Sequence, residues 1–237
     1  MSCILHIETS TEVCSVALSQ DGSCLFEQKN TEGHQHATLL APYAAEALSF
    51  ADSHAIPVDA VAVSSGPGSY TGLRIGVSTA KGICYGRGIR LIAVPTLKVL
   101  CVPVLLYHDE LPDEALLCPM IDARRMEVYA AVFDRSLQPV RETRADVVRS
   151  DTYAQFLNER PVYFFGNGAK KCKEVLTHPN AHFIDGVYPS ARNMLPLAEQ
   201  AMARGHFEDV AYFEPFYLKA FIASRPKDLL HETRTPR

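Results

Sequence analysis

Two short polar turns in the sequence each begin with a carboxylate, at Glu8 and at Asp122. In phosphotransferases that carry such a turn, the sequence of the turn is acid-x-Gly-Thr. The glycine lets backbone N–H groups approach a phosphate, and the acid orients a hydrated metal. Here Ser10 stands in the glycine place, and Arg124 and Arg125 put long side chains into the second turn. We interpret Glu8, Ser10, Asp122 and Arg124 as the remnant of a nucleotide site, and we expect both carboxylates mainly to order their own turns.

A glycine-rich run at residues 65–76 is a second candidate for phosphate chemistry. It follows an apolar strand and opens a helix, whose N-terminal amides attract anions, but it lacks the lysine of a Walker loop. Gly72, Gly76 and Ala80 recur every four residues along that helix, with two more glycines beyond. Glycine inside a helix costs about 1 kcal/mol relative to alanine. Close approach of another helix, from the same chain or from a partner, explains the glycines, and both origins remain open.

The sequence predicts no metal ligand, no cofactor site and no catalytic residue. His34 and His36 have a spacing that points their side chains apart on a helix. His178 and His182 have the spacing of a helical metal-binding pair, but Pro179 lies between them and breaks the helix. The seven cysteines include no Cys-x-x-Cys pair, so we expect reduced thiols buried on apolar faces.

The elements that must position these residues alternate between strands and helices. Three strand-like runs open the chain, with Asp21-Gly22 as a hairpin signal. A strand at 60–64 feeds the glycine-rich run, and another follows at 90–94. Together these elements predict a mixed sheet with crossover helices. Helices are predicted at residues 36–52, 73–85, from Pro95 through Leu100, 169–176 and 191–204, and a further strand at 162–165.

The second half of the chain repeats the start of the first. Residues 7–18 are echoed by residues 121–133, because each segment ends a strand with Ile plus a carboxylate and opens another with Glu-Val. A duplication places the two acidic turns opposite each other across a cleft, as in the actin-like and sugar-kinase-like (ASKHA) fold. We therefore predict an α/β fold of two halves with mixed sheets. The predicted divisions are residues 1–107, residues 108–218 and a tail at 219–237.

Composition excludes some function classes. The 237 residues are 47% hydrophobic, enough for a sizeable core. The net charge of -4 and the pI of about 6.1 argue against a broad basic nucleic-acid surface, so any RNA role is expected to be shared with a partner. Glu8 interrupts the N-terminus before a signal-peptide core could form, and no apolar run approaches membrane-spanning length. We expect a cytoplasmic protein with no membrane contact.

The run Ser65-Gly66-Pro67-Gly68-Ser69-Tyr70-Thr71-Gly72-Leu73-Arg74-Ile75-Gly76 resembles the hallmark of the TsaB (YeaZ) family, the dimerisation subunits of the bacterial complex that makes threonylcarbamoyladenosine in tRNA. Further blocks resemble the family in the same order, so the resemblance extends to about Leu218. These blocks are Ile7-Glu8-Thr9-Ser10-Thr11, Val94-Pro95-Thr96-Leu97, residues 121–129 and Phe165-Gly166-Asn167-Gly168-Ala169.

The resemblance implies an actin-like fold without a working catalytic site of its own. It implies pairing with TsaD, the paralogue that transfers the threonylcarbamoyl group to the adenosine beside the anticodon of ANN-decoding tRNAs, and assembly with the ATPase TsaE. Self-association is expected when TsaD is absent, and tRNA is reached only through the complex. The family pairs through its first two helices. On this chain that surface maps to Leu40, Tyr43, Ala44, Ala47, Gly72, Arg74, Gly76 and Ala80.

Two other function classes stay open at this stage. An enzyme of the same fold, either a small-molecule kinase or an M22-type peptidase, would turn over substrate as an isolated chain. A direct tRNA-binding module would bind RNA in a salt-dependent way, which the acidic balance opposes. The sequence does not say whether Arg74, Arg124 or Arg125 touches a nucleotide, the ATPase or RNA.

Overall fold

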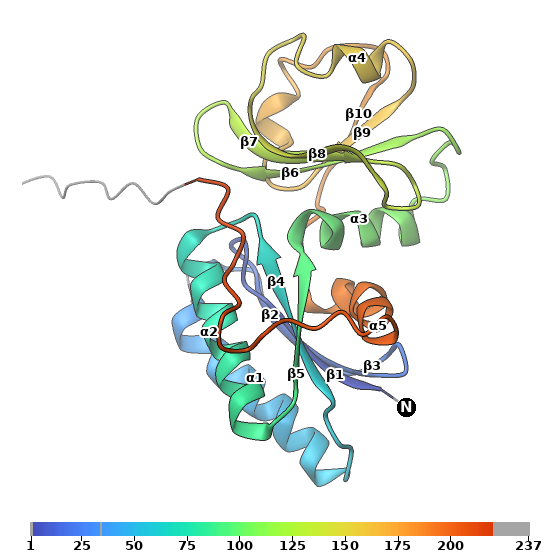
Figure 1. The fold of residues 1–237 in the computed structure, drawn as a ribbon. Coiled ribbons are helices and arrows are strands. Elements are labelled where there is room, and N and C mark those ends of the chain that lie inside the picture. Colours follow the sequence, from blue (N-terminus) through green and yellow to red (C-terminus); the bar gives the residue numbers. More distant parts are fainter. Residues whose placement is uncertain (1, 34, 220–237) are drawn as a thin grey trace, which may run out of the picture.

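The computed structural model describes residues 2–33 and 35–219 and shows two lobes, one above the other (Figure 1). The first lobe contains a five-stranded sheet with the order β3-β2-β1-β4-β5, and the second contains a sheet with the order β10-β9-β6-β7-β8. Predictions that concern His34 or residues 220–237 lie outside the described residues. The strands are β1 Cys3–Glu8, β2 Cys14–Gln20, β3 Ser23–Asn30, β4 Ala60–Gly66, β5 Arg90–Pro95, β6 Leu116–Asp122, β7 Glu127–Phe133, β8 Pro139–Val147, β9 Val162–Phe165 and β10 Ala181–Ile184.

The two sheets repeat one topology. β1 is antiparallel to β2 and parallel to β4. In the second lobe β6 is likewise antiparallel to β7 and parallel to β9. The second strand order, read in reverse as β8-β7-β6-β9-β10, therefore matches the first position by position. The predicted duplicated α/β fold is therefore confirmed, with β6 as the counterpart of β1.

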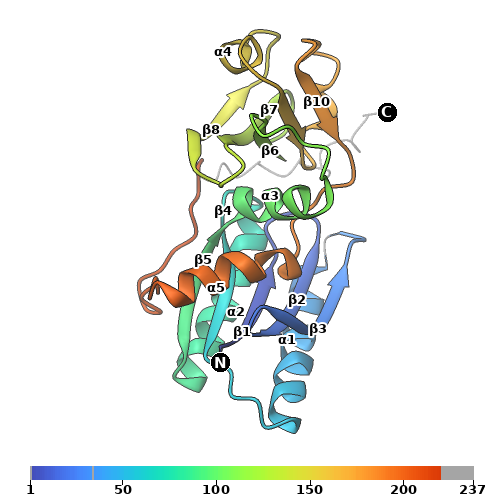
Figure 2. The same ribbon diagram turned by 90° about the vertical axis from the view of Figure 1, so that its right-hand side faces the viewer.

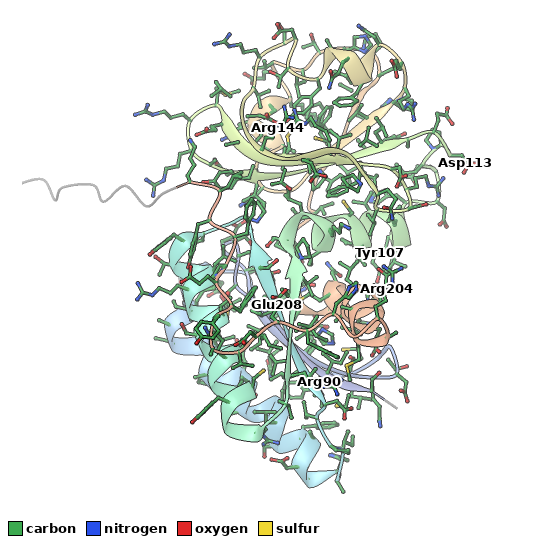
Figure 3. The ribbon with its side chains drawn as sticks, viewed as in Figure 1. Arg90, Tyr107, Asp113, Arg144, Arg204 and Glu208 are labelled. Carbon is green, nitrogen blue, oxygen red and sulfur yellow. The ribbon has the colours of Figure 1, made fainter. Side chains whose placement is uncertain are left out.

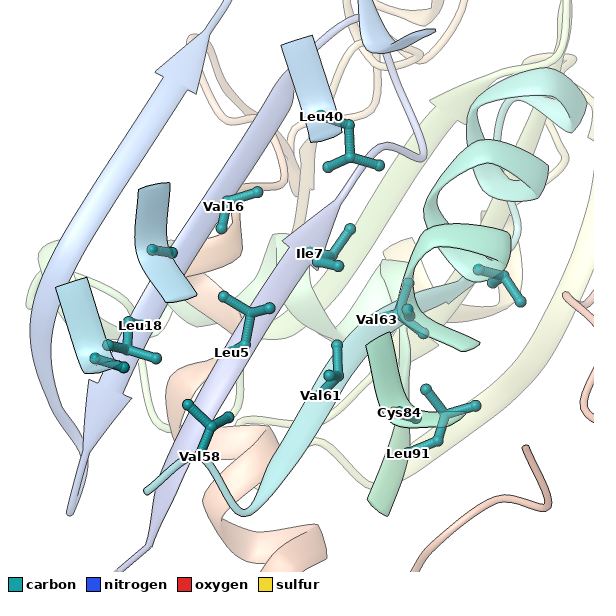
Figure 4. Packing of buried hydrophobic residues seen from close by; sticks show 14 of the residues in the cluster. Leu5, Ile7, Val16, Leu18, Leu40, Val58, Val61, Val63, Cys84 and Leu91 are labelled. Carbon is teal, nitrogen blue, oxygen red and sulfur yellow. The ribbon is translucent and has the colours of Figure 1, made fainter. Parts of the chain in front are cut away.

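Helices α1 (His36–Ser53) and α2 (Tyr70–Arg87) cover one face of the first sheet. Their apolar sides form a core with the alternate side chains of β1, β2 and β4, which Figure 4 shows from close by. Both helices confirm their predictions, but α2 begins three residues earlier than expected because Ser69 caps it, accepting a hydrogen bond from the Gly72 N–H at 3.2 Å. Gly88 ends α2 in the left-handed conformation that glycine favours, with φ +67°.

Helix α3 (Thr96–Tyr107) lies between the two sheets, as Figures 1 and 2 both show. Val99 packs into the core of the first lobe, whereas Leu97 and Leu100 pack against the sheet of the second. Helix α5 (Leu195–Ala203), preceded by the short 3-10 helix η2 (Ala191–Met194), confirms the predicted helix at 191–204. It packs on the first sheet, on the face opposite α1 and α2.

The division of the chain differs from the predicted boundaries in one respect. Helix α3 leads into β6 of the second lobe, but residues 191–217 return to the first lobe instead of staying with the second. Residues 207–219, which we call the strap, bind Leu91 and then Ser65 through backbone hydrogen bonds of 2.9 Å and 2.7 Å. The correction follows from packing: the apolar side of α5 matches an uncovered face of the first sheet.

The predicted helix at 169–176 is wrong. Only the 3-10 helix η1 (Lys170–Cys172) forms there, followed by turns, because the buried positions Ala169, Cys172 and Leu176 suit successive turns as well as a helix. A short helix, α4 (Ala154–Leu157), covers the outer face of the second sheet. No helix in the described part of the chain combines the length and the apolar character that crossing a membrane requires.

Candidate functional site

The first acidic turn is closed on itself. Glu8 is fully buried, and one carboxylate oxygen accepts the backbone N–H of Ser10 at 2.6 Å. The hydroxyl of Ser64, at the end of β4, donates to the other oxygen. Burial raises the pKa of Glu8, while its hydrogen bonds from Ser10 and Ser64 act in the opposite direction. The carboxylate thus orders the turn, as the sequence predicted.

The glycine-rich run packs directly on that turn. The Ser69 N–H donates to the Ser10 carbonyl at 2.7 Å, and the Thr9 hydroxyl donates to the Gly72 carbonyl at 2.8 Å. A Cβ on Gly72 would overlap the Thr9 carbonyl, and a Cβ on Gly76 would overlap the Thr9 hydroxyl. These glycines therefore allow α2 to contact the turn of its own chain.

The second acidic turn repeats this geometry. Asp122 accepts a hydrogen bond from the backbone N–H of Arg124, two residues further along the chain, at 2.6 Å, as Glu8 does from Ser10. It also accepts a hydrogen bond from the ammonium group of Lys171 at 2.6 Å. Arg124 and Arg125 have left-handed backbone conformations, with φ +72° and +50°. Both arginine side chains are exposed. This turn therefore carries two cationic side chains at the place where a phosphate-binding loop has accessible backbone N–H groups.

The two turns face each other and are joined. The Asn167 side-chain amide donates to Glu12, which follows the first turn, at 2.8 Å. The oxygen of the same amide accepts the backbone N–H of Asp122 at 3.0 Å. Lys219, at the end of the strap, forms an ion pair with Glu127 beside the second turn. The predicted opposition of the two turns is confirmed, but protein groups bridge the space between them.

The predicted pairing residues are mostly inside the chain. Leu40, Ala44, Ala47, Gly72, Gly76 and Ala80 are buried, and the partly buried Tyr43 packs against the same core. Among the eight, Arg74 is the one that faces solvent. The correction has a simple cause: a four-residue repeat of apolar and small residues marks the face of a helix that packs on its own sheet.

A different row of small residues is exposed on α2. A Cβ on Gly82 or on Gly86 would meet no atom within 4 Å, so the described part of the chain gives neither glycine a packing reason. Tyr85 lies between them with 87% of its surface exposed. Helix α1 exposes its own row, namely Ala37, Ala41 and Ala45. The sequence shows these glycines, but it does not show that they lie on the exposed side of the helix.

The strap borders this face of α2. Lys81 donates to the carbonyls of Ala211 and Phe213, each at 3.0 Å, and the rings of Tyr70 and Tyr217 lie 4.7 Å apart. In Figure 1 the strap runs beside α2 toward the second lobe. The free face of α2 therefore lies between α1 and the strap.

The histidines and cysteines considered as metal ligands or nucleophiles are engaged in other contacts or buried. His178 accepts the Asn180 N–H at 3.1 Å, and His182 stacks on Tyr163 at 4.8 Å, so the pair does not converge. Six of the seven cysteines are buried, and burial raises the pKa of Cys14 and Cys84 to about 11. Within residues 2–33 and 35–219, no three His, Cys, Asp or Glu side chains are grouped as metal ligands.

Comparison with known proteins gives consistent matches. The model of the family described as TsaD, tRNA N6-adenosine threonylcarbamoyltransferase, matches residues 30–226. The tRNA threonylcarbamoyladenosine biosynthesis protein TsaB of Escherichia coli is 30% identical over 93% of this chain and 96% of its own length. The Bacillus subtilis protein of the same name is 28% identical over 73% of this chain and 74% of its length.

Solved structures agree with the sequence relatives. A Pseudomonas aeruginosa crystal structure, described as similar to the peptidase YeaZ, superposes with a TM-score of 0.79 at 26% identity, covering 92% of this chain and all of that one. A second structure, YeaZ from the same organism, superposes with a TM-score of 0.73 at 27% identity, again over 92% and 100% of the two chains.

Proposed function

The chain belongs to the TsaB (YeaZ) family, within the wider TsaD family, and we propose on that premise that it is a non-catalytic subunit in the biosynthesis of threonylcarbamoyladenosine in tRNA. Its role is to bind a TsaD-like paralogue that performs the transfer. A TsaE-like ATPase joins the same assembly, the chain self-associates when the paralogue is absent, and tRNA is contacted through the complex.

One observation supports the pairing role above all: on the free face of α2, no atom of residues 2–33 or 35–219 lies within 4 Å of a Cβ added to Gly82 or Gly86. Each costs about 1 kcal/mol relative to alanine inside a helix, so a pair without an internal reason indicates an external one. Rows of small residues let two helices approach closely, and exposed tyrosines such as Tyr85 are typical anchors at the centre of an interface. Ala41 and Ala45 of α1 extend the same surface.

The state of the two acidic turns supports the non-catalytic part of the proposal. A phosphate loop needs accessible backbone N–H groups, whereas the Ser10 N–H is bonded to Glu8 and the Arg124 N–H is bonded to Asp122. The Ser10 carbonyl is covered by the start of α2. These bonds leave the turns in a closed state that suits a scaffold better than a phosphotransferase.

Co-purification with the TsaD-like paralogue of the same organism tests the pairing. We expect the full-length chain to retain the paralogue and Gly82→Leu to weaken binding by at least tenfold, roughly 1.4 kcal/mol, because the added side chain keeps the helices apart. Gln200→Leu is the matched control, since it adds the same side chain to the exposed side of α5. Undiminished binding by Gly82→Leu would exclude this face.

Incubation of the isolated chain with ATP and magnesium tests the absence of catalysis. We expect hydrolysis no faster than a buffer blank. Turnover by the wild-type chain that Glu8→Gln abolishes would show a working site and would favour the small-molecule kinase instead.

A further inference from the structure

A pocket of about 600 Å³ opens on the outer face of the second lobe, between β8 and α4. Three arginines line it: Arg141 and Arg144 from β8, and Arg160 from the turn that follows α4. Figure 3 labels Arg144 on this lobe, away from α1 and α2. The pocket is separate from the acidic turns and from the proposed pairing face.

A β-bulge brings two of these arginines to one face of the sheet. Arg144 pairs with Ala130 of β7, and Arg141 pairs with Val132, with a shift of register between the two pairs. Ala130 and Val132 both belong to the core that α4 covers, and residues paired across neighbouring strands share a face. Residues three apart on a regular strand point to opposite faces, so the bulge makes this pairing of guanidinium groups possible.

Arg141 is held rigidly at the pocket wall. Its side chain is 10% exposed, forms an ion pair with Asp146 and lies over the ring of Tyr153 with 4.9 Å from guanidinium carbon to ring centre. The Tyr153 hydroxyl donates to the same Asp146 at 2.8 Å. Within the described residues the buried Nε of Arg141 has no hydrogen-bond partner. A buried donor without a partner is costly. Because Arg141 lines the pocket, the hydrogen bonds of its guanidinium group are incomplete at the pocket wall.

The other two arginines are also available to a ligand. Arg144 and Arg160 are exposed, and neither forms an ion pair within residues 2–33 and 35–219, although Glu142 and Glu159 line the same pocket. Phe156 adds an apolar surface beside them. The combination of one fixed guanidinium, two unpaired ones and an aromatic side chain differs from an ordinary charged sheet edge.

We propose that this pocket binds a small oxyanion, a phosphate or a carboxylate, through Arg141, Arg144 and Arg160. Guanidinium groups recognise such oxygens with paired, charge-assisted hydrogen bonds. Glu142 and Glu159 reduce the positive charge, so the site selects a ligand by geometry more than by charge. The proposed pairing surface lies on the other lobe, so this binding site is independent of the proposed function.

Isothermal titration of the full-length chain with inorganic phosphate, adenosine monophosphate and citrate tests the site. We expect saturable binding of one molecule per chain with a dissociation constant below about 10 mM for at least one probe. Tighter binding of the nucleotide than of phosphate would identify a phosphate ester whose base contacts Phe156. Tightest binding of citrate would identify a carboxylate ligand.

The double variant Arg144→Gln/Arg160→Gln removes two charges without touching the Arg141–Asp146 pair, and we expect it to weaken binding at least about tenfold while the melting temperature is unchanged. Arg204→Gln, an exposed arginine that Figure 3 labels on the first lobe, is the control and should bind like the wild type. Absence of binding by all three probes overturns the proposal, and so does binding that the double variant leaves intact.

Discussion

The side-chain amide of Asn167 in the second lobe donates to the carboxylate of Glu12 in the first at 2.8 Å, while its oxygen holds the backbone N–H of Asp122. One residue therefore joins the two acidic turns of the duplicated fold. Each carboxylate that begins a turn, Glu8 or Asp122, is used internally, so the contact between the lobes depends on neighbouring polar groups.

Asn167→Asp should weaken this joint, because it places a second carboxylate opposite Glu12 while it keeps an acceptor for the Asp122 N–H. For such exposed groups we expect a loss of about 0.5–1 kcal/mol in the free energy of unfolding at pH 7, measured with urea. The loss should shrink at high salt, which screens the repulsion. Equal stability of Asn167→Asp and wild type at low salt would contradict the role of the contact.

The two kinds of glycine in α2 should respond to alanine in opposite directions. Gly76→Ala forces a Cβ against the Thr9 hydroxyl, so we expect destabilisation of about 1–3 kcal/mol. Gly82→Ala meets open space and should stabilise the isolated chain by up to about 1 kcal/mol. Thermal unfolding measures both, and a loss of stability in Gly82→Ala would show that its surroundings are occupied.

Stability should fall in acid because of His6, which is fully buried with its Nε2 at 2.8 Å from the Ser19 hydroxyl. Burial lowers its pKa from 6.5 to about 3, so between these values the unfolded chain binds the additional proton. The contribution of His6 to the unfolding free energy should therefore drop as pH falls from 6.5 toward 3, by at most about 1.4 kcal/mol per pH unit for one proton.

The raised pKa of Glu8 acts with the opposite sign, since its contribution is complete below pH 4.5 and is lost as pH rises through its folded pKa. His6→Gln isolates the histidine: the stability difference between wild type and variant should shrink as pH falls from 6.5 to 4.5, because only the wild type loses the His6 contribution, while the Glu8 contribution is common to both. His182→Gln, at an exposed position, is the control that should keep the wild-type slope. Parallel slopes for all three chains would contradict the prediction.

Lys81 should hold the strap in place through its hydrogen bonds to the carbonyls of Ala211 and Phe213. Lys81→Met removes both, at a cost of about 1–3 kcal/mol to the local stability of the strap. Amide hydrogen exchange should then accelerate at Phe216, whose N–H donates a hydrogen bond to the Ser65 carbonyl, while exchange in β1 is unaffected. Lys170→Met, at an exposed site, is the control. Unchanged exchange at Phe216 would mean that other contacts suffice to hold the strap.

The amino-acid sequence by itself determined the elements of the first lobe and their repetition in the second, but not the helix expected at residues 169–176. The apolar stripe of residues 36–52, the strand, turn and helix around the glycine-rich run, and the echo of residues 7–18 in residues 121–133 are local patterns. Local backbone preferences and periodicity suffice to interpret them, although the capping by Ser69 that starts α2 three residues early was missed. The family followed from motifs of the same kind.

Tertiary structure alone decided which side of each helix is free. Gly72, Gly76, Gly82 and Gly86 are the same residue in one helix, yet the first two pack on Thr9 and the last two meet open space. A small residue allows close packing of any neighbouring backbone. The sequence therefore could not distinguish packing against the chain's own turn from packing against a partner protein. The return of the strap to the first lobe and the pairing of Arg141 with Arg144 likewise depend on contacts between distant segments, which no local pattern encodes.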